Sequence, residues 1–108
     1  MDNFEQKWAQ VLDMLTERFG KTPDLQAILF LIGINELGAL HSDKFTKEQK
    51  QDLMHIAVCK LLSIMGFYIY EGRDEDGWPH YRDTGISPVR GLEQQEQMLK
   101  ECIILYFQ

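Results

Sequence analysis

Residues 25–37 read LQAILFLIGINEL, and this stretch decides the fold. Apolar side chains fall on every side of a helical wheel drawn through it, which is typical of a helix buried inside a protein. The stretch is too short to cross a membrane, which takes about 20 apolar residues in a row. We therefore expect residues 24–37 to form a helical hub, shielded from water, around which the other segments pack.

Both ends of this helix carry recognisable signals. Thr22-Pro23-Asp24 predicts its start, because a Thr hydroxyl can cap a free N–H, Pro suits the first helical position and Asp favours the positive end of the helix dipole. Gly38 predicts its end. Gly33, in the middle, costs roughly 1 kcal/mol relative to alanine. We expect a close approach of another helix over Gly33 to offset that cost.

Length and charge restrict the class of protein. The 108 residues are enough for one hydrophobic core, so we expect a single globular domain over residues 1–108. A formal net charge of −6 disfavours a broad nucleic-acid-binding surface, which needs clustered Lys and Arg. An acidic chain could instead mimic DNA or block a nucleic-acid-binding partner. We disfavour this alternative because the 11 basic residues are interspersed among the 17 acids.

Two cysteines and the N-terminus indicate the compartment. Cys59 and Cys102 lie inside predicted helices and form no CxxC or disulfide-scaffold pattern. Reduced, buried thiols in the cytoplasm are the simplest interpretation. Residues 1–5 are acidic and lack an apolar segment, so we expect no signal peptide.

Three more helices are predicted from apolar residues at helical spacing. One spans about residues 3–19, and one spans about 46–65 and opens with a capping box in which Thr46 and Gln49 bond each other's backbone. The last spans about 88–107, with Ser87 and Pro88 as its start. Its C-terminal end is apolar nearly all round, so we expect it to dock in the core or to be shared with another subunit.

Between the last two helices the pattern changes to that of a β-hairpin. Residues 67–70 are aromatic and β-branched, and Asp76-Gly77 is a strong signal for a two-residue turn. This turn would pair Glu75 with Trp78, Arg73 with His80, Glu71 with Arg82 and Tyr70 with Asp83. An Ω-like loop is the alternative. The predicted fold is therefore mainly α, a four-helix orthogonal array or bundle with one β-hairpin inserted between helices three and four.

Glu36 is the acid in the apolar stretch. It lies on an otherwise apolar stripe, at the end of the helix where a negative charge opposes the dipole. A buried carboxylate either finds a partner or its pKa rises. Glu36 is therefore a candidate acid, base or metal ligand in a cleft. The alternative is that the helix end reaches the surface, or that Glu36 pairs with a histidine or with Arg73, Arg82 or Arg90.

His55 and Cys59 lie four residues apart on one helical face, with Asp52 one turn earlier. This spacing suits a catalytic Cys–His pair or a metal site, since a histidine lowers the pKa of a neighbouring thiol. Two ligands do not make a zinc site, so no metal is predicted. His55 and Cys59 remain catalytic candidates, against the alternative of a solvated or hairpin-covered helix face.

The segment from Gly77 to Arg82 is the most distinctive predicted surface. Trp, Tyr and Arg are enriched at binding hot spots, so Trp78, His80, Tyr81 and Arg82 are candidate binding residues. The alternative is that Trp78 and Tyr81 only pin the hairpin onto the helices. The acidic run just before this segment does not fit a calcium loop, because Gly72 and Asp83 stand where a carboxylate and a Glu are needed.

Three segments, residues 29–38, 52–57 and 76–81, together resemble a family of small uncharacterised bacterial proteins. The resemblance covers most of the chain. It implies a bacterial, cytosolic origin, and no particular activity or functional residue.

No phosphate-binding glycine loop, nucleophile elbow or HExxH motif is present, and no cofactor is predicted. We expect a cytoplasmic, non-enzymatic protein-interaction module that binds a protein partner or forms a homodimer, with no role for nucleic acid or membrane. The alternative is a small enzyme or a ligand- or metal-binding domain. Its site would lie between the hairpin and helices two and three, at Glu36, His55, Cys59 and His80.

Overall fold

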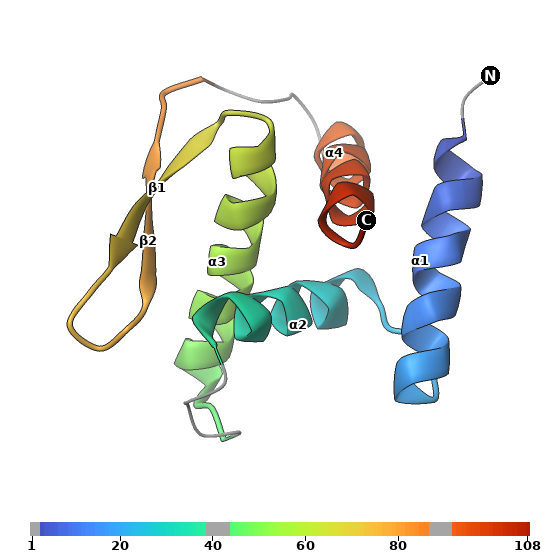
Figure 1. The fold of residues 1–108 in the computed structure, drawn as a ribbon, viewed down its shortest axis with the longest axis horizontal. Coiled ribbons are helices and arrows are strands. Elements are labelled where there is room, and N and C mark those ends of the chain that lie inside the picture. Colours follow the sequence, from blue (N-terminus) through green and yellow to red (C-terminus); the bar gives the residue numbers. More distant parts are fainter. Residues whose placement is uncertain (1–2, 39–43, 87–91) are drawn as a thin grey trace.

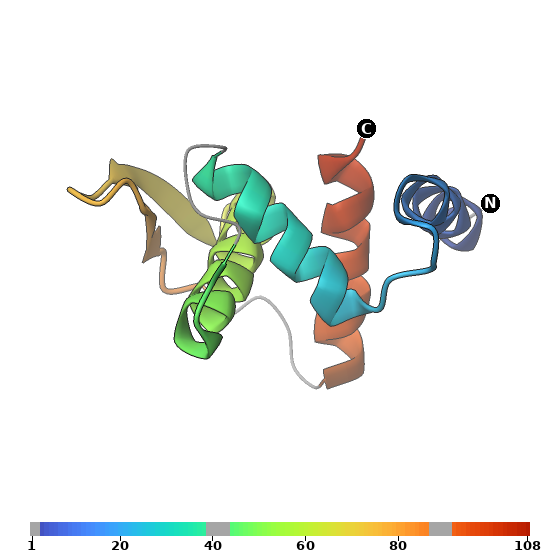
Figure 2. The same ribbon diagram turned by 90° about the horizontal axis from the view of Figure 1, so that it is seen from below.

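The computed structural model describes residues 3–38, 44–86 and 92–108, and confirms a mainly helical fold with a hairpin between helices three and four (Figure 1). The hairpin and the first helix lie at opposite ends of the molecule in both views (Figure 2). None of the helices in the described part of the chain could span a membrane. The elements are α1 (Phe4–Phe19), α2 (Leu25–Leu37), α3 (Lys47–Ile64), β1 (Tyr68–Arg73), β2 (Pro79–Asp83) and α4 (Leu92–Tyr106).

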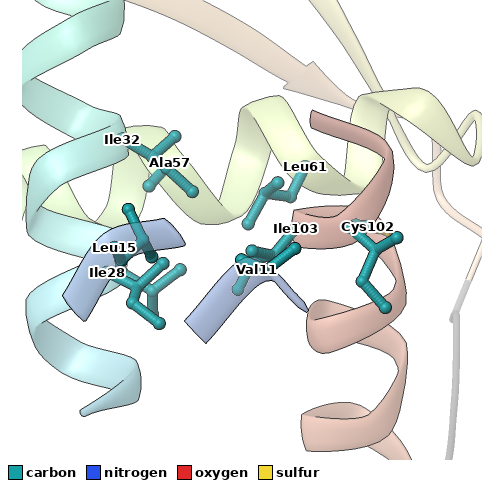
Figure 3. Packing of buried hydrophobic residues seen from close by; sticks show 10 residues of the cluster. Val11, Leu15, Ile28, Ile32, Ala57, Leu61, Cys102 and Ile103 are labelled. Carbon is teal, nitrogen blue, oxygen red and sulfur yellow. The ribbon is translucent and has the colours of Figure 1, made fainter. Parts of the chain in front are cut away.

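All four helices contribute to one hydrophobic core (Figure 3). The hub prediction for α2 holds on one side only. Ile28 and Ile32 are fully buried, whereas Phe30, Leu31 and Ile34 on its other faces are half-buried. In a protein of this size, the three other helices do not surround α2, so part of its apolar surface stays uncovered. The core residues are Val11, Leu15, Ile28, Leu29, Ile32, Ala57, Leu61, Cys102, Ile103 and Ile104.

The predicted close approach at Gly33 is confirmed. A Cβ atom placed on Gly33 would lie 2.2 Å from the backbone oxygen of Leu53, so α2 and α3 touch backbone to backbone at this point. The absence of a side chain therefore allows the tight α2–α3 packing that compensates for the low helix propensity of glycine.

The helix ends follow the sequence signals, with one correction. The Thr46–Gln49 capping box of α3 is present, and Gly38 ends α2 in a positive-φ conformation. The N-cap of α2 is Asp24, which accepts a 2.8 Å hydrogen bond from the Ala27 N–H, and not Thr22. The Thr22 hydroxyl instead bonds the Thr16 hydroxyl at the end of α1, at 2.8 Å.

The last helix, α4, docks in the core. This is one of the two alternatives predicted for its apolar C-terminal end. Cys102, Ile103 and Ile104 are buried, while Leu105 on the outer face remains 46% exposed. The structure gives α4 from Leu92, and the predicted cap at residues 87–88 falls outside the described residues.

The hairpin is present but its predicted register is wrong. The Asp74 N–H donates to the Trp78 oxygen, so the turn has three residues between its paired ends instead of two. A bulge between Tyr70 and Gly72 then shifts the register again, leaving Tyr70 opposite Tyr81. Each shift comes from one extra residue. A positive-φ glycine accommodates each of them, Gly77 in the turn and Gly72 at the bulge.

Candidate functional site

The hairpin packs against α3 and leaves an open cavity of about 350 Å³ between them, which we term the hairpin groove. One wall comes from the face of α3 on which the sequence places His55 and Cys59. The other wall comes from the turn of the hairpin and β2. The residues that line it are Asp52, His55, Ile56, Cys59, Asp74, Trp78, Pro79, His80 and Tyr81.

Three of the four predicted binding residues, Trp78, His80 and Tyr81, line the hairpin groove. Trp78 and Tyr81 are half-buried, and the His80 side chain is 60% exposed. Arg82 does not line the groove, and its guanidinium pairs with the Glu71 carboxylate at 3.3 Å. This is the charge pair predicted for the hairpin, reached across the bulge and not as a direct cross-strand pair.

His55 and Cys59 are neighbours in the lining of the groove, with Cys59 Sγ 3.6 Å from His55 Nε2. Burial, together with the negative charge of Asp83, raises the pKa of the Cys59 thiol to about 11. The thiolate is the nucleophilic form of cysteine, and at neutral pH this thiol is protonated. The environment of Cys59 is therefore the reverse of the one that activates a catalytic cysteine.

This environment gives a direct test with iodoacetamide. At pH 8 we expect Cys59 to react roughly 100-fold or more slowly than in urea-unfolded protein, because its thiolate fraction is lower and its sulfur is buried. The rate should go on rising with pH until about pH 11. A Cys102→Ser background isolates Cys59, and mass spectrometry follows the reaction. A rate at pH 8 equal to that of the unfolded chain would contradict the assignment.

Asp74 organises the turn beside the groove. Its Oδ1 accepts hydrogen bonds from the backbone N–H groups of Asp76 and Trp78, and its Oδ2 lies 2.8 Å from His80 Nε2. The hydrogen bond from His80, followed by those from the backbone, lowers the pKa of Asp74 below its usual value. In the sequence, Asp74 belongs to the acidic run that does not fit a calcium loop, and no other role was predicted for it. Its partnership with His80 depends on the three-residue turn, which the Asp-Gly signal did not predict.

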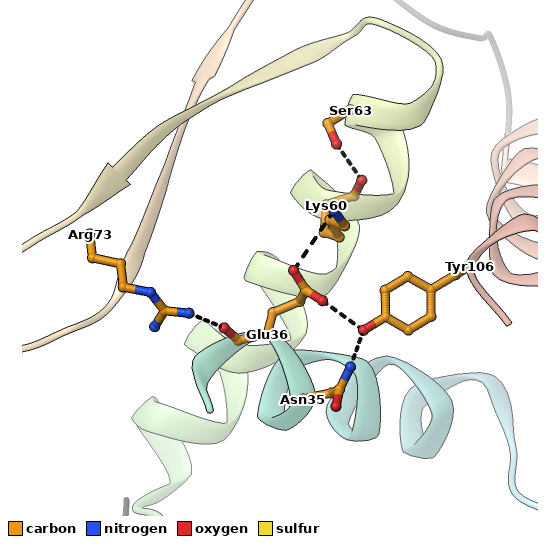
Figure 4. Close-up of polar contacts among 6 residues, drawn as sticks. All are labelled: Asn35, Glu36, Lys60, Ser63, Arg73 and Tyr106. Atoms are coloured by element: carbon orange, nitrogen blue, oxygen red, sulfur yellow. Dashed lines mark hydrogen bonds and ion pairs between the residues drawn. The ribbon is translucent and has the colours of Figure 1, made fainter. Parts of the chain in front are cut away.

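Glu36 lies outside the hairpin groove, in a smaller cavity of about 180 Å³ with Lys60 and Arg73 (Figure 4). The Tyr106 hydroxyl donates to Glu36 Oε2 at 2.7 Å and accepts from Asn35 Nδ2, while Lys60 Nζ lies 3.9 Å from Oε1. Burial and the bond to Glu36 raise the pKa of Tyr106 to about 12. The carboxylate therefore joins α2 to α3 and to the end of α4.

The arginine partners predicted for Glu36 do not pair with its carboxylate in the described structure. Arg73 donates instead to backbone oxygens, those of Leu37 at 2.8 Å and of Glu36 at 2.7 Å, and also to that of Gly77 at 2.7 Å. Arg82 pairs with Glu71, and Arg90 lies outside the described residues. Arg73 thus caps the free carbonyls at the C-terminal end of α2 from the hairpin.

The structure divides the four residues of the predicted enzyme or ligand site. His55, Cys59 and His80 line the hairpin groove, and Glu36 lines the neighbouring cavity. Pro79 and Tyr81 border both cavities. Within the described ranges, no three His, Cys, Asp or Glu side chains gather closely enough to hold a metal ion.

No protein-family model, no curated protein and no solved structure matches this chain. The resemblance to small bacterial proteins therefore stays a prediction.

Proposed function

We propose that this protein is a non-enzymatic interaction module that binds a positively charged segment of a protein partner in the hairpin groove. The observation that carries the proposal is the composition of the groove. Aromatic Trp78 and Tyr81 line it together with the carboxylates of Asp52 and Asp74, and no Lys or Arg is among the described residues that line it. A lysine or arginine side chain is attracted both to aromatic faces and to carboxylates.

The charge around the groove supports a cationic partner. The low pKa of Asp74 keeps its carboxylate ionised at neutral pH, and exposed Glu75 and Asp76 extend the negative charge along the turn. The whole chain carries −6. The same charges repel the phosphates of nucleic acid, which supports a protein as the partner.

Binding is favoured over catalysis by the state of the groove's reactive groups. The protonated thiol of Cys59 lacks the low pKa of a cysteine nucleophile. Burial and the negative charge of Glu36 also raise the pKa of Tyr81, to about 12, so its hydroxyl stays neutral. The free, buried thiols Cys59 and Cys102 support a reducing location, and we propose the cytoplasm.

The proposal is tested by the fluorescence of Trp78. The other tryptophan, Trp8, lies on α1, and its ring centroid is 5.4 Å from Lys100 Nζ. A Trp8→Phe variant leaves Trp78 as the sole fluorescent tryptophan. We expect blocked tetralysine to cause a saturable change in emission at low salt, and blocked tetraglutamate to cause none. Added salt should weaken the response, since the attraction is between exposed charges.

A matched pair of charge reversals locates the binding site. Asp52→Lys places a positive charge in the groove and should weaken tetralysine binding about tenfold or more. Asp13→Lys makes the same change at an exposed position on α1 and should leave affinity within about twofold, because distant surface charges are screened. Equal effects of the two variants, or no saturable response to tetralysine, would overturn the proposal.

A further inference from the structure

A second concave surface lies over the C-terminal end of α4, and we term it the C-terminal cleft. It has a volume of about 320 Å³. Buried Ile104 lines it, together with Phe4 of α1, Met65 at the end of α3 and Leu105 of α4. Met65 and Leu105 are 40% and 46% exposed. The cleft shares no lining residue with the hairpin groove.

The cleft also carries two opposite charges from different helices. Lys7 of α1 and Glu101 of α4 both line it, and neither forms an ion pair among the described residues. The Glu101 carboxylate accepts only a long, 3.4 Å hydrogen bond from Gln97 of its own helix within the described part of the chain. The apolar surface therefore shares its lining with one positive and one negative group, of equal and opposite charge.

This arrangement is self-complementary. In a twofold-symmetric contact, the same patch faces itself, and each residue of one subunit meets a different residue of the other. A twofold axis in the contact plane, midway between Lys7 and Glu101, brings Lys7 of each copy against Glu101 of the other. Two equivalent ion pairs form in this arrangement, and the exposed Met65 and Leu105 side chains would be covered in the same contact.

We propose that the C-terminal cleft binds a second copy of this chain. The inference extends the proposed interaction role by naming a partner, and it uses a surface separate from the hairpin groove. The apolar patch is small, so we place the contact at the lower end of protein interfaces, about 1,200 Å² in total. Such a contact gives a dimer that dissociates on dilution.

The test is sedimentation velocity of the full chain over roughly a hundredfold range of concentration. We expect the wild type to shift from monomer to dimer across this range. Leu105→Glu should weaken association about tenfold or more. Phe19→Glu makes the same kind of change at a 50% exposed site at the far end of α1, and should leave association unchanged.

Charge reversal tests the predicted pairing without relying on Leu105. Lys7→Glu and Glu101→Lys should each weaken dimerisation several-fold, and the double variant should restore it to within about threefold of the wild type. A wild type that stays monomeric throughout, or single reversals that the double variant does not rescue, would overturn the proposal. Asp52→Lys should leave dimerisation intact, so failure here is distinguishable from failure of the groove proposal.

Discussion

Replacing Gly33 with alanine should lower the free energy of unfolding by about 3 kcal/mol, at the upper end of the cost of overpacking. The added methyl would meet the backbone oxygen of Leu53 at 2.2 Å and its Cβ at 2.9 Å. A backbone atom inside a helix cannot rotate away, so α2 and α3 must move apart along their contact. The gain of roughly 1 kcal/mol in helix propensity is smaller than this loss.

Urea denaturation measures the effect directly, and the melting temperature should fall by roughly 10–20 °C. Gln26→Ala is the matched control, because it also introduces an alanine into α2, but at an exposed position. We expect it to change stability by less than about 0.5 kcal/mol. A Gly33→Ala variant as stable as Gln26→Ala would show that the backbones of α2 and α3 do not meet at this point.

Replacing Arg73 with methionine should cost about 2 kcal/mol and release the hairpin from α2. The guanidinium makes three hydrogen bonds, of 2.7 to 2.8 Å, to the carbonyls of Glu36, Leu37 and Gly77. Hydrogen bonds from charged donors contribute about 1.5–3 kcal/mol each when buried. Arg73 is exposed, and solvent screening weakens such bonds, so we discount the combined contribution of the three to about 2 kcal/mol.

Amide hydrogen exchange distinguishes local release from general destabilisation. In Arg73→Met, the Asp74 amide, which bonds the Trp78 oxygen across the turn, should exchange faster by a larger factor than core amides of α3. Arg82→Met is the control, since it removes a second arginine of the same hairpin, whose partner within the described ranges is Glu71, in a surface ion pair. We expect its cost to stay below about 1 kcal/mol. Equal effects of the two substitutions would contradict the anchoring role of Arg73.

The helices could be predicted because their signals are local. The Thr46–Gln49 capping box requires only residues three positions apart, and Gly38 ends α2 through its own positive φ. The fold class then followed from the order of the elements. The error at the start of α2 was also local, since Thr22 and Asp24 are both acceptable caps and the contact with Thr16 in α1 occupies Thr22.

The hairpin register could not be predicted because two turns were compatible with one signal. Asp76-Gly77 suits both a two-residue and a three-residue loop, and each choice moves every following pair by one residue. The Asp74 side chain, which accepts from the Asp76 and Trp78 N–H groups, stabilises the longer loop. The bulge at residue 71 then shifts the pairing by one more residue, so that Tyr70 lies opposite Tyr81 and not Asp83.

The candidate site was predicted in part. The α3 face with Asp52, His55 and Cys59 followed from helical spacing, and the aromatic hairpin residues followed from composition. That these two surfaces form one groove, while Glu36 lies in the next cavity, depends on the angle at which the hairpin meets α3. The Tyr106 partner of Glu36 lies 70 residues further along the chain, beyond the reach of any local pattern.

By itself, the sequence determined the helical elements, the presence of a hairpin and the need for a close contact at Gly33, because each depends on neighbouring residues or on a single side chain. Only the tertiary structure decided which polar groups meet. Packing of the helices brings Glu36 and Tyr106 together. The hairpin turn brings Asp74 and His80 together, and the local sequence allowed two turn geometries that it could not distinguish.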